Sequence, residues 1–528
     1  MLKRVKLLIA SGLVAFAMSS PTFASDHVLR IAYPDDPKTI DVQKTTDYYT
    51  LPLNVYDRLV EAETSGPGQS KLVPGLAESW DVSDDGKTYT FHLRKGVLFH
   101  HGEELTADDV VYTFDRMLDP KTKALSTDIL NFVDGAAERL DGSATTVRGL
   151  QAVDKYTVKI VLKEPYAAFI ALVASPGASI YNRKFTEPLG DQYGLTPETT
   201  NGTGPFILKS YTLNDSQVIV ANDKYYKGRP KLDEINIRVV SDPETMRLLF
   251  ESDELDVFDV DYAASQLPYF ISSDKWKNQV RSGPRVGIYY FNINQALKPF
   301  DDVRVRKAFQ MAINRKQILD KNFYGKGILE NGVMPRGLTC YEPAKEIEYN
   351  PEKAKQLLAE AGYPNGVDIN LTQVSSWSSK WSDMNQIVQA QVKKAGFNAQ
   401  IKTMDESAYY ATRKAGKVDN YTQSWSADFN DPDNFFYTFF SESGSAVRSF
   451  NNNDADAFAA VDKARTITNP DERCALYRKL GERIVQDDAA WVPLFSLDHV
   501  YVVQPRVKSF TVPWNGWSDM SYYQMDVE

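Results

Sequence analysis

Enzyme chemistry has few candidate residues in this sequence, because histidine and cysteine are scarce: the chain has 5 His and 2 Cys among 528 residues. It contains no Gly-x-Ser-x-Gly turn, no His-Glu-x-x-His helix and no Gly-x-x-x-x-Gly-Lys-Ser/Thr loop, which are typical of serine nucleophiles, catalytic zinc and bound nucleotides. His100 and His101 are adjacent, and neighbouring side chains on a strand or turn point apart, which disfavours a shared metal ion. We therefore predict no catalytic residue, no metal site and no cofactor. Acidic and serine side chains leave a hydrolase as a remote alternative.

The N-terminus has the pattern of a cleavable export signal. Lys3, Arg4 and Lys6 precede a short apolar run, residues 7–18, and small side chains follow up to Ala24. We expect cleavage after Ala24, and the alternative of a membrane anchor is disfavoured because no later apolar stretch has spanning length. Without residues 1–24 the formal net charge changes from −10 to −13. An acidic chain is poorly suited to nucleic acid, so we expect a periplasmic protein that is not membrane-embedded.

The elements that must position any binding residues follow from length and periodicity. About 500 mature residues exceed what one hydrophobic core supports, so at least two lobes are expected. Alternating segments predict strands at residues 89–93, 157–162, 217–221, 235–240, 286–292, 500–503 and 510–512. Amphipathic segments predict helices at residues 106–117, 303–313, 351–361, 382–395 and 471–486. This interleaving predicts the α/β class with mixed sheets. Cys340 and Cys474 could form one disulfide, which the sequence leaves open.

Several long segments resemble the bacterial extracellular solute-binding proteins of the dipeptide, oligopeptide and nickel class (family 5). The first match is "LVPGLAESW" at Leu72–Trp80, continued by the stretch from Asp85 to Leu118. Further matches, in family order, are "NGTGPF" (201–206), "NDKYYKGRPKLDEI" (222–235), "RVRKAFQMAINR" (304–315), "YNPEKAKQLLAEAGYPNG" (349–366) and "WSADFNDPDNFF" (425–436). They span nearly the whole mature chain.

The resemblance implies a two-lobed periplasmic-binding-protein clam-shell with a two-strand hinge, which encloses its ligand on closure. The first lobe would contain residues 25–283 plus 498–528, with an inserted subdomain at about 60–180, and the second lobe residues 284–497. A Gly-Pro pair at Gly283 and Pro284 marks the expected boundary. Most of the matched stretch from Asp85 to Leu118 is expected to be scaffold.

Asp428 is the main candidate for ligand binding, because peptide-binding members of the family use the matching Asp to hold the free amino terminus. The alternative is that Asp428 caps the turn into Asn430–Pro432. Trp425, Ser426 and Ala427 would be an extended segment that pairs its backbone with the ligand. Trp425 could form a pocket wall or belong to the core.

The partner of a ligand carboxylate is less well defined by the resemblance. Arg413 matches a basic residue of oligopeptide-binding relatives, and Lys380 is the single cation of residues 374–383; either could instead be a solvated surface charge. The Arg expected for a strict dipeptide binder is missing. Asp36 lies in a segment that lines the cleft in relatives, but a turn role is the alternative.

The function implied is a non-catalytic receptor, expected to be a monomer, that captures di- to oligopeptides and delivers them to an ABC import permease. The alternatives keep the fold and change the solute to an opine, glutathione, an oligosaccharide, haem or a nickel chelate. Ligand length, side-chain preference and the identity of the permease do not follow from the sequence.

Overall fold

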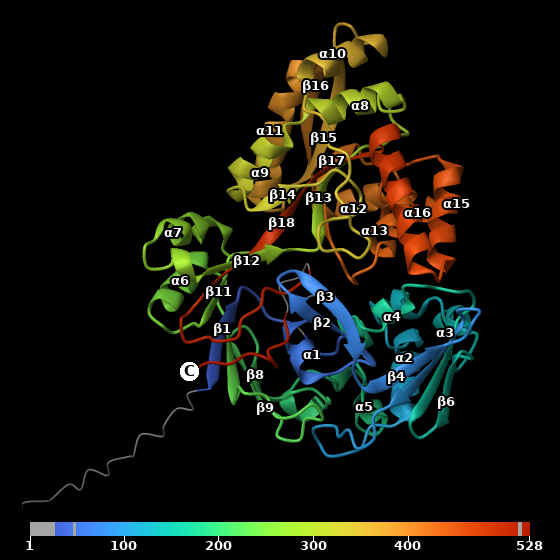
Figure 1. Ribbon diagram of the computed structural model, residues 1–528, viewed down its shortest axis with the longest axis vertical. Coiled ribbons are helices and arrows are strands. Elements are labelled where there is room, and N and C mark those ends of the chain that lie inside the picture. Colours follow the sequence, from blue (N-terminus) through green and yellow to red (C-terminus); the bar gives the residue numbers. More distant parts are fainter. Residues whose placement is uncertain (1–26, 38, 46–48, 516–519) are drawn as a thin grey trace, which may run out of the picture.

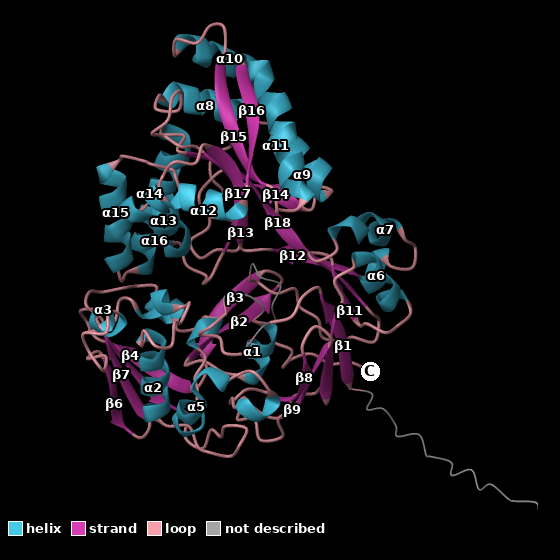
Figure 2. Cartoon of the chain, turned by 180° about the vertical axis from the view of Figure 1, so that it is seen from behind, coloured by secondary structure: helices cyan, strands magenta, loops and turns pink. Residues whose placement is uncertain are grey.

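The computed structural model describes residues 27–37, 39–45, 49–515 and 520–528, and the predicted export signal, residues 1–24, lies outside these ranges. Within them the chain forms two lobes, one above the other along the long axis of the molecule (Figure 1). Helices and strands are mixed in both lobes (Figure 2), so the predicted α/β class is confirmed. No helix in the described ranges is long and apolar enough to cross a membrane.

The lower lobe in Figure 1 is built on a four-stranded sheet of order β1-β10-β9-β8. Its strands are β1 (Val28–Tyr33), β8 (Phe206–Thr212), β9 (Ser216–Ala221) and β10 (Glu234–Val239). β1 is parallel to β10, and the other neighbours are antiparallel. Alternate residues such as Ile235 and Ile237 are buried and pack in one cluster with Val55 of α1 (Thr50–Val55). The period-2 pattern that predicted β9 and β10 therefore marks the face that packs in the core.

The same lobe carries a hairpin and a second, antiparallel sheet of order β4-β5-β7-β6. The strands are β2 (Val60–Gly66), β3 (Gln69–Pro74), β4 (Ala77–Val82), β5 (Thr88–Leu93), β6 (Leu150–Asp154) and β7 (Thr157–Val161). The helices are α2 (Ala107–Leu118), α3 (Ala136–Leu140), α4 (Phe169–Leu172) and α5 (Arg183–Leu189), with a 3₁₀ turn η1 (Thr127–Leu130). The Thr106 backbone N–H donates to Asp109 Oδ2 (2.9 Å), which completes the capping box at the start of α2. Phe91, Phe114 and Ile160 belong to the apolar cluster of this region.

A mixed sheet of order β11-β18-β13-β17-β15-β16, with β12 and β14 also paired to β18, extends from the upper lobe into the lower lobe, where β11 lies beside β1 (Figure 1). The strands are β11 (Val257–Asp259), β12 (Val280–Pro284), β13 (Gly287–Asn292), β14 (Gly327–Leu329), β15 (Val367–Val374), β16 (Phe397–Met404), β17 (Asn420–Ser426) and β18 (Trp491–Val503). The first part of β18 pairs with β13 and β14, and its last part pairs with β11 and β12. Two segments, β18 and the run from β12 to β13, therefore connect the lobes (Figure 1).

Two strand predictions near the C-terminus have different outcomes. The strand predicted at residues 500–503 is confirmed as the end of β18, which begins at Trp491; the earlier part of β18 was missed because almost all of its residues are buried. Residues 510–512 form no strand. Val512 is buried in the apolar cluster of the lower lobe, so its apolar character reflects packing rather than strand pairing.

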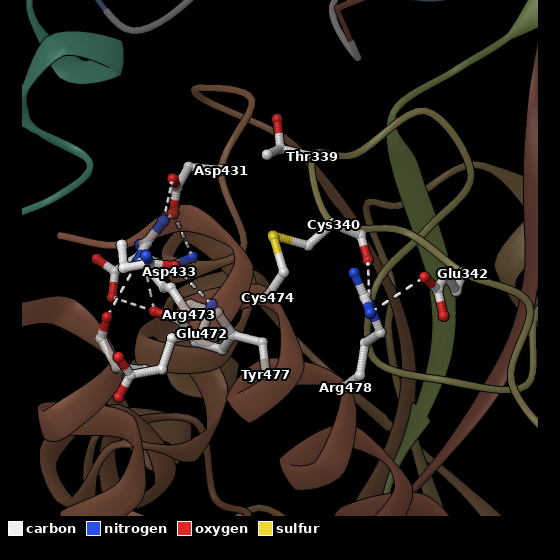
Figure 3. Close-up of a disulfide and its surroundings, with 12 residues drawn as sticks. Thr339, Cys340, Glu342, Asp431, Asp433, Glu472, Arg473, Cys474, Tyr477 and Arg478 are labelled. Atoms are coloured by element: carbon white, nitrogen blue, oxygen red, sulfur yellow. Dashed lines mark hydrogen bonds and ion pairs between the residues drawn. A yellow bond between two sulfur atoms is a disulfide. The ribbon is translucent and has the colours of Figure 1, made fainter. Parts of the chain in front are cut away.

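Helices flank the sheets. They are α6 (Pro243–Glu251), α7 (Leu267–Ser272), α8 (Val303–Ala312), α9 (Arg315–Phe323), α10 (Pro351–Glu360), α11 (Ser379–Val392), α12 (Glu406–Lys414), α13 (Asp433–Phe440), α14 (Glu442–Val447), α15 (Ala455–Thr466) and α16 (Pro470–Glu482). Cys340 and Cys474 form a disulfide with a Cα–Cα distance of 5.1 Å, which ties α16 to the loop after β14 (Figure 3). The sequence left this bond open, and the fold brings together two residues 134 positions apart.

Candidate ligand-binding site

A cavity of about 510 Å³ lies between the two lobes. The lower lobe lines it with the β2–β3 hairpin, the η1 turn and residues 171–177, and the chain returns near its end to add residues 509–515 and 520–525. The upper lobe contributes Thr339, Asp428, Phe429 and Asn430. A cavity of this size with both polar and apolar walls suits a small solute enclosed between two domains.

Asp428 follows β17 and is held in place by Asn434, on the first turn of α13. The Asp428 backbone N–H donates to Asn434 Oδ1 (3.1 Å), and Asn434 Nδ2 donates to Asp428 Oδ2 (2.9 Å). The turn itself uses Asp431, whose Oδ1 accepts from the Asp433 backbone N–H (2.8 Å). The Asp428 side chain is open to the cavity, yet the surrounding protein removes enough water to raise its pKa to about 6. The carboxylate is thus positioned at the cavity wall without serving as the turn's cap.

The loop that carries Asp428 is supported from α16 and from the neighbourhood of the disulfide (Figure 3). Arg473 binds Asp431 in a bidentate pair, Nη1 to Oδ2 at 2.6 Å and Nη2 to Oδ1 at 2.7 Å, and both side chains are buried. Thr339, next to Cys340, donates its backbone N–H to Asn430 Oδ1 (2.7 Å). The upper wall of the cavity is therefore fixed by a buried ion pair, a disulfide and side-chain amides.

The lower wall carries a cluster of charged side chains that satisfy one another. Arg58 Nε donates to Glu61 Oε2 (3.0 Å), and the two side chains form a close ion pair. Asp57 accepts hydrogen bonds from Thr203 Oγ1 and Tyr225 OH, each at 3.0 Å. Burial raises the pKa of Asp57. These charged groups therefore have hydrogen-bond or ion-pair partners within the lower lobe and leave little capacity for a ligand.

Asp128 and Lys227 also line the cavity, and neither forms an ion pair in the described part of the chain. Asp128 lies in η1, and burial raises the pKa of its carboxyl group. Lys227 Nζ lies 5.5 Å from the centre of the Tyr226 ring. The cavity therefore offers a cation and carboxylates that have no close ion-pair partner in the described ranges, and a zwitterionic solute can complement both kinds of charge.

The lobes also touch at an edge remote from the hinge strands. Tyr166 OH of the lower lobe donates to Asp433 Oδ2 (2.6 Å), and the Ala167 N–H donates to the Arg465 carbonyl (3.0 Å). The Arg465 guanidinium lies 5.0 Å from the Tyr166 ring centre and 3.5 Å from that of Tyr437. Arg465 thus bridges aromatic rings of both lobes.

Of the residues predicted from the sequence, Asp428 is the one that the structure places in the cavity wall. Trp425 is half-buried, with its ring 5.6 Å from that of Phe439 and its Nε1 donating to Asn434 Oδ1 (3.0 Å). Ser426 is paired with Gly287 in the β13–β17 register, and the Ala427 N–H donates to the Val286 carbonyl (2.9 Å). One backbone edge of this segment is therefore already used by β13.

The other three predicted residues lie outside the cavity lining. The Arg413 guanidinium lies 4.9 Å from the Tyr410 ring centre, and Lys380 Nζ lies 5.4 Å from that of Trp381. Asp36 is buried and accepts from the Asn214 N–H (2.6 Å) and Gln217 Nε2 (2.9 Å), so it ties its loop to β9. Contact between these residues and a ligand stays a prediction. Sequence reasoning missed Asp128, which no motif marks, and Lys227, which lies in the family match at residues 222–235 but was given no role in binding.

Two lobes joined by strand segments around an interlobe cavity define a solute-binding protein of the clam-shell type. The profile of the bacterial extracellular solute-binding proteins, family 5 Middle, matches residues 71–446, and the chain belongs to this family. It is 31% identical over 500 residues to heme-binding protein A of Haemophilus influenzae, covering 92% of this chain and 88% of that protein. It is also 31% identical over 500 residues to the dipeptide-binding protein of Escherichia coli, covering 90% of each. The structure of HbpA2 from Haemophilus parasuis superposes with a TM-score of 0.81 at 26% identity, covering 95% of this chain and 100% of that one.

Proposed function

We propose that this protein captures short peptides, or closely related amine-bearing solutes, in the interlobe cavity and delivers them to an ABC import permease. The observation that carries the proposal is the Asp428 carboxylate at the cavity wall, which is held by Asn434 while Asp431 makes the turn. The 31% identity to a dipeptide-binding protein over 90% of the chain supports the same solute class.

In this proposal Asp428 binds the ligand's ammonium group, and Lys227 binds its carboxylate. Lys227 takes the role expected of Arg413 or Lys380, because it lines the cavity and they do not. Residues 425–427 would add backbone pairing, which is blind to side chains and therefore suits a receptor for peptides as a class.

The protein is proposed to act in the periplasm as a monomer after cleavage behind Ala24. Residues 25–283 with 498–528 would form one lobe, with a subdomain at about 60–180, and residues 284–497 the other. The protein would not turn over its ligand. ATP would be hydrolysed on other subunits, since the sequence has no phosphate-binding Gly-x-x-x-x-Gly-Lys-Ser/Thr loop.

Haem is the second candidate ligand, favoured by the 31% identity to heme-binding protein A over 92% of the chain. Neither histidine nor cysteine is among the described residues that line the cavity, so an iron ligand would have to be a tyrosine or methionine. Titration with haemin, followed by its absorption band, separates this candidate from the first.

Native mass spectrometry of mature protein purified without refolding tests the proposal. We expect a set of short peptides to copurify with the wild type and to be lost from Asp428→Asn. Asp84→Asn, an exposed change on the lower lobe outside the cavity, is the matched control and should keep the peptides. A single non-peptide mass in the wild type would refute the peptide assignment.

A further inference from the structure

Acidic residues outnumber basic residues among the charged side chains that line the cavity. These charged residues are Asp57, Arg58, Glu61, Glu63, Asp128, Lys227 and Asp428. Arg58 forms an ion pair with Glu61. Glu63 Oε1 accepts a hydrogen bond from Gln524 Nε2 (2.6 Å), and Glu63 Oε2 lies 3.5 Å from Lys71 Nζ. Within the described ranges no Lys or Arg nitrogen lies within 4.0 Å of the Asp128 or Asp428 carboxylates. Two carboxylates without a close ion-pair partner therefore face the cavity. Arg448 stabilises the Asp428 carboxylate only from a longer distance, and Lys227 does the same for Asp57.

Asp128 and Asp428 come from opposite lobes and line the same cavity. Phe429, which follows Asp428, packs in the same apolar cluster as Ile129 and Leu130, which follow Asp128. The two charges are close enough that Asp128 raises the pKa of Asp428, in addition to the larger effect of burial. Two like charges from opposite lobes thus interact at the wall of one cavity, where they have lost part of their hydration.

This arrangement has an electrostatic consequence for ligand choice. Closure of the lobes over a ligand with one ammonium group leaves one of the two carboxylates uncompensated in a drier cleft, which costs free energy. A ligand with a second positive charge close to its amino terminus compensates both. Because the charges lie on different lobes, such a ligand also links the lobes.

We propose that Asp128 and Asp428 together make the cavity selective for peptides with a basic first residue, Asp428 binding the ammonium group and Asp128 the lysine or arginine side chain. The inference rests on the proposed function and adds to it a residue that determines specificity. Charge-assisted hydrogen bonds between an ammonium group and a carboxylate are among the stronger pairwise contacts in such a site.

Isothermal titration of two tripeptides, Lys-Ala-Ala and Met-Ala-Ala, tests the inference, since the two first side chains are both long and unbranched and differ in charge. We expect the wild type to bind Lys-Ala-Ala roughly tenfold more tightly, because one extra charge pair forms. Asp128→Asn should bind the two peptides about equally, and its affinity for Met-Ala-Ala should be at least that of the wild type, because the uncompensated carboxylate is gone; this also shows that the fold is intact. Asp84→Asn should keep the tenfold preference.

The outcomes separate this inference from the proposed function. Equal affinities in the wild type, or a preference that survives Asp128→Asn, would overturn the role of Asp128 while peptide binding stands. Binding of neither peptide to the wild type would overturn both proposals.

Discussion

Replacing both Cys340 and Cys474 by serine opens a covalent loop within the upper lobe. The two cysteines are 134 residues apart in the sequence. Closing a loop of this length lowers the entropy of the unfolded chain, which corresponds to about 5 kcal/mol of stability at 25 °C. We therefore expect the double serine variant to have a free energy of unfolding lower by about 5 kcal/mol.

Urea unfolding followed by tryptophan fluorescence measures this change, since the chain has 8 Trp residues. Wild-type protein treated with a thiol reductant is the control and should converge on the variant's midpoint. A decrease below about 1 kcal/mol would refute the reasoning from loop entropy. Because Thr339 next to Cys340 bonds to Asn430, the variant should also bind its ligand more weakly.

Three further predictions concern the charged groups of the site and the lobe contact. The ionised form of Asp428 binds an ammonium group, and burial raises the pKa of its carboxyl group to about 6. Lowering the pH from 7 to 5 should therefore weaken peptide binding about tenfold, as measured by calorimetry. The variant Asp428→Asn should lack this pH dependence. Arg473→Met leaves Asp431 buried without its partner and should lower the free energy of unfolding, measured by urea unfolding, by about 3–5 kcal/mol. The double variant Arg473→Met/Asp431→Asn should recover part of this stability. Equal stability losses in the single and double variants would contradict the pairing. Arg465→Met removes a cation–π contact that stabilises the interlobe contact by about 1–2 kcal/mol. The radius of gyration of the ligand-free protein, measured by small-angle X-ray scattering, should therefore increase. An unchanged radius of gyration would contradict the role of Arg465 as a bridge between the lobes.

Sequence patterns predicted helices and strands well where only one face of the element is buried. Thr106 caps α2, whose first turn contains Asp108 and Asp109, and Pro351 is the first residue of α10; residues of these types are typical of helix starts. β18 was recognised only at its end, because a strand buried on both faces lacks the alternation that identifies strands. The disulfide could not be predicted, since the approach of Cys340 to Cys474 depends on how α16 packs.

The residues of the candidate site also differ in whether the sequence could predict them. Asp428 was predicted because it lies in a motif that resembles the family's, and the motif carries its own support in Asn434. Asp128 and Lys227 could not be predicted, because they reach the cavity only through contacts between segments that are distant in the sequence. Arg413 was a reasonable candidate by charge, but its guanidinium lies against aromatic rings outside the cavity lining.

The central claim is that Asp428 binds a free amino terminus inside the interlobe cavity. Calorimetric titration of Met-Ala-Ala and its N-acetylated form into the wild type and Asp428→Asn tests it most directly. The account predicts that acetylation weakens binding to the wild type at least tenfold and makes no difference to Asp428→Asn, since the charge pair is then already lost. Equal binding of the two forms to the wild type would contradict it.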